Sequence, residues 1–178
     1  MAIEIVYETH STTLDNERGF ATGWNQGELS EVGRQQARET GLRHADREID
    51  VVYPSDLRRA TESAEIAFGN RDIEIRADAR LRECNFGEWN GALVERVHAD
   101  RKRFIDEPHP GGETYRQVVD RVRNFLDELA MTDAKSVVLI SHRAPWYAME
   151  HLLKDVALED VVVAPFEWQP GWRYTLNR

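Results

Sequence analysis

The sequence is poor in cysteine and contains no long apolar run. Its 178 residues include a single cysteine, Cys84, so an intrachain disulfide framework is excluded and a cytoplasmic location is expected. No apolar stretch approaches the roughly 20 residues that a membrane-spanning helix needs. The acidic start, Met1-Ala2-Ile3-Glu4, lacks the basic and then apolar profile of a signal peptide. We therefore expect no membrane association.

Basic residues are also scarce relative to acidic ones. The chain has 23 Lys and Arg against 32 Asp and Glu, a formal net charge of −9. This balance argues against nucleic-acid binding, which normally uses a basic face. It also means that any site for an anionic substrate must be a local concentration of Arg, His and backbone N–H groups that overcomes the overall field.

Repeats, low-complexity segments and linkers rich in Gly, Pro or Ser are absent, so one domain over residues 1–178 is expected. Apolar patterns predict strands over 3–8, 49–53, 73–75, 136–141, 161–163 and 172–176. They predict helices over 31–42 (capped by Ser30), from 54–56 to 68, over 94–105, 114–131 and 145–153. Segments 10–29 and 81–91 show no clear period, and we expect a long functional loop over the first. The alternation of strands and helices predicts an α/β fold, a three-layer αβα sandwich whose mostly parallel central sheet is flanked by helices.

Polar clusters follow three of the predicted strands. They are Thr9-His10-Ser11, the segment from Ser55 to Arg59, and Ser141-His142-Arg143. Because sites in such folds form beyond the carboxyl ends of the strands, these side chains are expected to meet. A nucleophile, cations for the nonbridging oxygens and an acid for the leaving group are what phosphoryl transfer requires.

Six short motifs, in order along nearly the whole chain, resemble those of the histidine phosphatase, or phosphoglycerate mutase-like, superfamily. The family's opening motif usually reads Arg-His-Gly-Glu-Thr with an Asn six residues after the His, and His10 and Asn16 keep that spacing. The other five are Ala21-Thr22-Gly23-Trp24 with its continuation into 29–33, Ser55-Asp56-Leu57-Arg58-Arg59-Ala60, Leu81-Arg82-Glu83 followed by 86–91, Pro110-Gly111-Gly112-Glu113, and Ser141-His142.

The resemblance implies a role for each matched residue. His10 would be the nucleophile that becomes a phosphohistidine, and Glu83 would protonate the leaving group and later activate water. Arg59, His142 and Asn16 would hold the phosphoryl oxygens, and Thr22 and Gly23 would contribute to substrate binding. The implied activity is a phosphomonoesterase of the histidine acid phosphatase type that acts on a small phosphorylated molecule without a metal or cofactor.

Two departures from the family pattern stand out. Thr9 replaces the Arg that normally precedes the nucleophile, and Ser11 replaces the following Gly. The lost charge-assisted contact is worth about 1.5–3 kcal/mol. Arg143 stands where the family commonly has Gly after its second His. The hypothesis is that Arg143 restores the lost charge and that Thr9 and Arg143 both contribute to substrate binding.

Two alternative functions remain open. Thr22-Gly23-Trp24 favours a phosphoglycerate mutase-type phosphotransferase, whereas the short segment between Gly91 and Pro110, whose one basic cluster is 101–103, does not. Thr9 is also compatible with a catalytically impaired homologue that binds a phosphate ligand. The remaining histidines lack motif support and are interpreted as structural or exposed: His44, His98, His109 and His151. The sequence indicates neither the particular substrate nor the oligomeric state.

Overall fold

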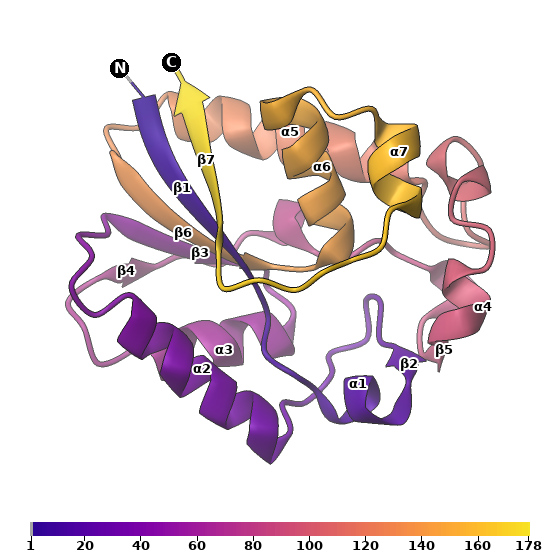
Figure 1. Ribbon diagram of the computed structural model, residues 1–178, viewed down its shortest axis with the longest axis horizontal. Coiled ribbons are helices and arrows are strands. Elements are labelled where there is room, and N and C mark those ends of the chain that lie inside the picture. The colour runs from indigo at the N-terminus through magenta and orange to yellow at the C-terminus, as the bar shows by residue number, and fades with distance from the viewer. Residues whose placement is uncertain (1) are drawn as a thin grey trace.

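A five-stranded sheet in the order β4-β3-β6-β1-β7 forms the centre of the computed structural model, which describes residues 2–178 (Figure 1). Neighbouring strands are parallel, except that β7 pairs antiparallel with β1. The sheet is therefore mostly parallel, as the sequence predicts. Its strands are β1 (Ala2–Thr9), β3 (Val51–Pro54), β4 (Glu74–Ile75), β6 (Ser136–Ser141) and β7 (Trp172–Asn177).

Helices cover both faces of this sheet and complete the predicted three-layer sandwich (Figure 1). On one side lie α2 (Glu31–Arg43) and α3 (Arg58–Phe68), which pack on each other. On the other side lie α5 (Tyr115–Ala130), α6 (Arg143–Lys154) and α7 (Leu158–Val163). None of the helices within residues 2–178 combines the length and the apolar character that crossing a membrane would take.

The continuous apolar sequence of β6 is explained by its position, because both faces of this strand are covered. Val137 and Leu139 belong to the larger core cluster, which also contains the buried residues of α5, α6 and α7. Val138 and Ile140 point the other way and pack in the smaller cluster with the alanines of α3. Because successive side chains of a strand face opposite sides, a strand covered on both faces must be apolar throughout.

Small residues allow α2 and α3 to approach closely. Gly41 of α2 sits so near α3 that a Cβ atom there would lie 2.5 Å from the carbonyl oxygen of Ala67. Capping confirms two predicted helix starts. The side chain of Ser30 accepts a hydrogen bond from the Gly33 N–H at 3.1 Å, and Thr114 forms a capping box at the start of α5.

The strand prediction for residues 161–163 is wrong, because these residues belong to α7. Leu158, Val161 and Val162 are buried at spacings of three and four, which places them on one helix face against the core. A run of three apolar residues fits a strand or a helix equally well, so the pattern alone does not distinguish them.

Three other segments also differ from the sequence predictions, beyond shifts of one or two residues at the ends of several elements. The segment 10–29 contains a short helix, α1 (Leu14–Arg18), and a short strand, β2 (Phe20–Ala21), which pairs with β5 (Ala92–Leu93). The predicted helix over 94–105 consists of α4 (Val94–His98) and a separate 3₁₀ turn over Arg103–Ile105. Helix α3 starts at Arg58 rather than within 54–56, since Pro54 is the last residue of β3 and Leu57 is the N-cap residue of the helix. Figure 1 shows α1, β2, β5 and α4 gathered beyond one end of the sheet.

Candidate active site

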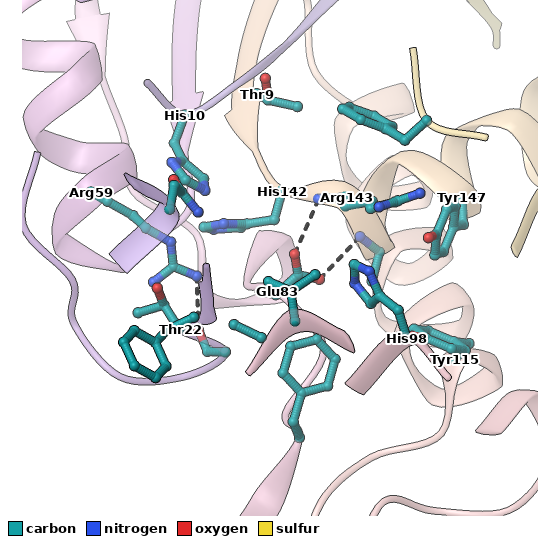
Figure 2. Close-up of a pocket in the computed structure, with 18 residues that line it drawn as sticks. Thr9, His10, Thr22, Arg59, Glu83, His98, Tyr115, His142, Arg143 and Tyr147 are labelled. Carbon is teal, nitrogen blue, oxygen red and sulfur yellow. Dashed lines mark hydrogen bonds between the residues drawn. The ribbon is translucent and has the colours of Figure 1, made fainter. Parts of the chain in front are cut away.

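The carboxyl ends of β1, β3 and β6 open into a cavity of about 320 Å³. The backbone N–H of His10 donates to the carbonyl of Ser141 at 2.9 Å and so joins the ends of β1 and β6. All nine site residues predicted from the sequence line this cavity, and Figure 2 shows seven of them by label. They are Thr9, His10, Asn16, Thr22, Gly23, Arg59, Glu83, His142 and Arg143.

His10 has one ring nitrogen available for chemistry. Its Nδ1 lies 2.8 Å from the carbonyl oxygen of Ser11, which can only accept, so Nδ1 carries the proton and donates. Burial, reinforced by the Arg59 charge, lowers the pKa of His10 from 6.5 to about 3. The ring is therefore neutral at physiological pH, and the lone pair of Nε2 is free to act as a nucleophile.

His142 lies beside His10, with ring centroids 5.0 Å apart. Its Nε2 is 2.6 Å from the hydroxyl of Ser55, at the end of β3, and both residues are almost fully buried. The pKa of His142 lies well below its ordinary value, mainly because the ring is buried and next because of the charge of Arg59. Its Nδ1 has no hydrogen-bond partner among residues 2–178, so this nitrogen is available to a ligand.

Arg59 is 2% exposed and joins the long loop to α3. Its Nη1 donates to the Asn25 carbonyl at 2.9 Å and its Nη2 to the Gly23 carbonyl at 2.8 Å. Burial lowers its pKa to about 10, so the guanidinium keeps its charge at neutral pH. Gly23 has a positive φ of +56°, and a Cβ there would lie 1.9 Å from Oδ1 of Asn90, so this turn requires glycine.

Glu83 is held on both its carboxylate and its backbone. Carboxylate oxygens accept hydrogen bonds from the N–H groups of Arg143 at 3.2 Å and Ala144 at 3.0 Å, the first residues of α6 (Figure 2). The Glu83 carbonyl accepts from Nε1 of Trp24 at 2.8 Å and from Nη2 of Arg121 at 2.9 Å. These contacts point the carboxyl group into the cavity near His142.

Asn16 and Thr22 are engaged in local hydrogen bonds as well as lining the cavity. Oδ1 of Asn16 accepts from the Thr13 N–H at 3.0 Å, as part of the capping box of α1. The Thr22 hydroxyl donates to Asp15 at 2.8 Å. These bonds give both residues a structural role in ordering the loop, and their contribution to substrate binding stays a prediction.

The side chain of Arg143 turns to the wall opposite Arg59 (Figure 2). Its guanidinium carbon lies 4.9 Å from the centroid of the Phe166 ring and 5.9 Å from that of Tyr147. Burial and then the charge of Arg143 lower the pKa of His98 to about 4. For His10, the charge that adds to the effect of burial is that of Arg59 instead. Arg143 therefore does not stand beside Arg59.

His98, which the sequence analysis interprets as structural or exposed, lines the cavity (Figure 2). Tyr115 and Tyr147 also line the cavity without having been singled out in the sequence. Tyr147 follows Arg143 by four residues, which places both on one face of α6, but the sequence predicts this helix only from residue 145 and so gave no signal for the pair. Within residues 2–178, no group of three or more His, Cys, Asp or Glu side chains is arranged to hold a metal ion.

Comparison with known proteins agrees with this fold. Residues 9–164 match the family model of the histidine phosphatase superfamily (branch 1), and the chain belongs to that superfamily. The match does not confirm the histidine acid phosphatase type, which is a different family. All six motifs noted in the sequence lie wholly or partly within the matched range.

Relatives of this chain are named either as phosphatases or as phosphoglycerate mutases. The chain is 31% identical to phosphoserine phosphatase 1 of Hydrogenobacter thermophilus, over 88% of this chain and 78% of that protein. It is 31% identical to a 2,3-bisphosphoglycerate-dependent phosphoglycerate mutase of Parvibaculum lavamentivorans, over 70% of this chain and 65% of that protein. A solved structure of mycobacterial glucosyl-3-phosphoglycerate phosphatase with VO₃ is 27% identical and covers 92% of this chain and 87% of its own, with a TM-score of 0.79.

Proposed function

We propose that this chain is a metal-independent phosphatase that hydrolyses a small phosphomonoester through a phosphohistidine on His10. The observation that carries the proposal is the state of the His10 ring. It is neutral, its Nδ1 proton is committed to the Ser11 carbonyl, and its Nε2 shares a cavity with Arg59, His142 and Glu83. A neutral imidazole beside preorganised cationic and hydrogen-bonding groups suits nucleophilic attack on phosphorus.

In the first half of the reaction, Nε2 of His10 forms a bond to phosphorus and the bond from phosphorus to the ester oxygen breaks. Arg59 and Nδ1–H of His142 stabilise charge on the nonbridging oxygens, with Asn16 as a further donor. Glu83 gives its proton to the leaving oxygen. In the second half, Glu83 takes a proton from water, whose oxygen attacks the phosphohistidine and releases inorganic phosphate, which restores His10 and the Glu83 acid.

Two of the relatives support a hydrolase. Phosphoserine phosphatase 1 matches most of the chain, and the glucosyl-3-phosphoglycerate phosphatase structure contains VO₃, which adopts geometries similar to a phosphoryl group in transfer. Thr9 would leave the phosphoryl group with one Arg, Arg59, rather than the pair that the family pattern implies. We accordingly expect weaker phosphate binding than in a relative that carries both.

A phosphoglycerate mutase-type phosphotransferase is the second candidate, and the relative from Parvibaculum lavamentivorans favours it. The same first half-reaction would serve both activities, because both form a phosphohistidine. They differ in whether water or a second phosphate acceptor takes the phosphoryl group.

The test is phosphate release from a panel of phosphomonoesters in the presence of EDTA, by the wild type and by His10→Ala. Metal-independent release that disappears in the variant is expected, together with an acid-labile phosphoryl enzyme on rapid quenching. Isomer exchange of 3-phosphoglycerate faster than its hydrolysis would establish the mutase instead. Phosphate binding without turnover of any ester would show that the chain is the impaired homologue that Thr9 suggests.

A further inference from the structure

The cavity is larger than the proposed phosphoryl transfer needs. Its volume of about 320 Å³ is in the range of pockets that hold whole small ligands. His10, Arg59 and His142 surround one half, and Glu83 lies at the boundary (Figure 2). The other half lies beyond Glu83 from Arg59, where a leaving group that receives the Glu83 proton would extend. This half is lined by His98, Tyr115, Arg143, Tyr147 and Phe166.

Arg143 brings a positive charge to this second half without a protein anion to balance it. In the part of the chain that the structure describes, no carboxylate forms an ion pair with Arg143, and its buried Nε has no hydrogen-bond partner. Nearby arginines differ: Arg82 pairs with Asp56 at 2.6 Å and Arg121 with Glu113 at 3.0 Å. A partly buried cation without a partner is unfavourable, and a bound anion would relieve that cost.

We propose that Arg143, together with His98, binds a carboxylate on the leaving part of the substrate, so that the site selects phosphomonoesters with a second acidic group. The inference rests on the proposed function, because the proton delivered by Glu83 defines which part leaves. The two-pronged guanidinium matches a carboxylate in a bidentate contact, and the His98 ring adds an N–H donor. The rings of Phe166 and Tyr147 flank Arg143 and shield the contact from water.

The charge in this half suits a monoanion better than a second phosphate. Burial and the neighbouring Arg143 hold the pKa of His98 at about 4, so His98 is neutral at pH 7 and Arg143 supplies the formal charge at the contact. Arg101 acts from one layer further out, since its Nη1 donates to the Tyr147 hydroxyl at 3.1 Å. A phosphate dianion would leave more negative charge uncompensated.

The test compares equilibrium binding of 3-phosphoglycerate and glycerol 3-phosphate, which differ in a carboxylate against a hydroxymethyl group. Calorimetry on the His10→Asn protein measures binding without turnover, so the result does not depend on whether the wild type hydrolyses either compound. We expect 3-phosphoglycerate to bind about tenfold more tightly or better, which corresponds to one charge-assisted contact. In the same background, Arg143→Gln should bring the ratio of the two dissociation constants close to one, and Arg143→Lys should recover part of it.

Arg96→Gln is the matched control, because the Arg96 guanidinium also lies over an aromatic ring, 4.8 Å from the centroid of Trp89, but does not line the cavity. The control should keep the preference. Equal binding of the two ligands by the His10→Asn protein, or a preference that survives Arg143→Gln in a protein with an unchanged melting temperature, would overturn the proposal. Tighter binding of glycerol 1,3-bisphosphate than of 3-phosphoglycerate would overturn the assignment to a carboxylate. Failure of the proposed function would instead appear as absent turnover with every ester.

Discussion

Replacing Ser55 by alanine tests whether a residue that touches no reacting atom positions the site. The Ser55 hydroxyl is the hydrogen-bond partner of Nε2 of His142, at 2.6 Å, and both residues are buried. If the hydroxyl donates, Nδ1 of His142 carries the ring proton and can donate it to a phosphoryl oxygen. Ser55→Ala would leave Nε2 unpaired and release the ring to rotate or change tautomer.

The expected size of the effect follows from the cost of a buried unpaired nitrogen, about 1–3 kcal/mol. If this cost is expressed in the transition state, kcat/KM falls about 5- to 150-fold, at 1.4 kcal/mol per factor of ten. The loss should appear mainly in kcat, since His142 helps to stabilise the transferring phosphoryl group. Ser55→Cys, which keeps a weak donor in nearly the same volume, should fall between the wild type and Ser55→Ala.

Steady-state hydrolysis of p-nitrophenyl phosphate, with urea unfolding of each variant, measures both quantities. Ser30→Ala is the matched control, because it removes the serine that caps α2 and should cost about 1 kcal/mol of stability away from the cavity. Its kcat/KM should stay within about a factor of two of the wild type. If Ser55→Ala loses stability like the control but keeps its kcat/KM, Ser55 contributes packing alone and the positioning argument is refuted.

Three further predictions concern the phosphoryl half of the cavity. The pKa of His10 is lowered from 6.5 to about 3, so below pH 6.5 the unfolded chain takes up a proton that the folded chain does not. Wild-type stability should therefore fall by about 1.6 kcal/mol more than that of His10→Asn between pH 6.5 and pH 5 in urea titrations. Parallel pH profiles would contradict the shift. Thr9→Arg should raise kcat/KM about tenfold or more by restoring a charge-assisted contact, whereas Thr9→Met should not. Equal kcat/KM of Thr9→Arg and the wild type would show that a side chain at this position does not reach the phosphoryl group. Arg59→Met should lower kcat/KM at least about 100-fold, and it should speed amide hydrogen exchange around residues 23–25 because two loop carbonyls lose their donor. Arg59→Lys should keep more activity than Arg59→Met. Slow exchange in both variants would rule out a role of Arg59 in holding the loop.

Local patterns were sufficient for much of the fold. The apolar run over 136–141 required a strand covered on both faces, and the predicted cap Ser30 marked a helix start that the structure confirms. They were insufficient over 161–163, where three apolar residues fit either element. There the choice depended on Leu158, whose packing beside Val161 and Val162 against the core makes the segment a helix.

The site divides in the same way. The motifs by themselves predicted which residues meet. His10, Arg59 and His142 belong to clusters that follow strands whose carboxyl ends share one edge of the sheet, and they line one cavity together with Glu83, which the family resemblance indicated. Only the tertiary structure decided where the Arg143 side chain points and that His98 joins the site. A side chain's direction depends on rotamer and on neighbours distant in the sequence, here the ring of Phe166, which reaches the cavity from the segment before β7. No spacing in the sequence indicates that contact, so the residues of the cavity's second half could be identified only from the tertiary structure.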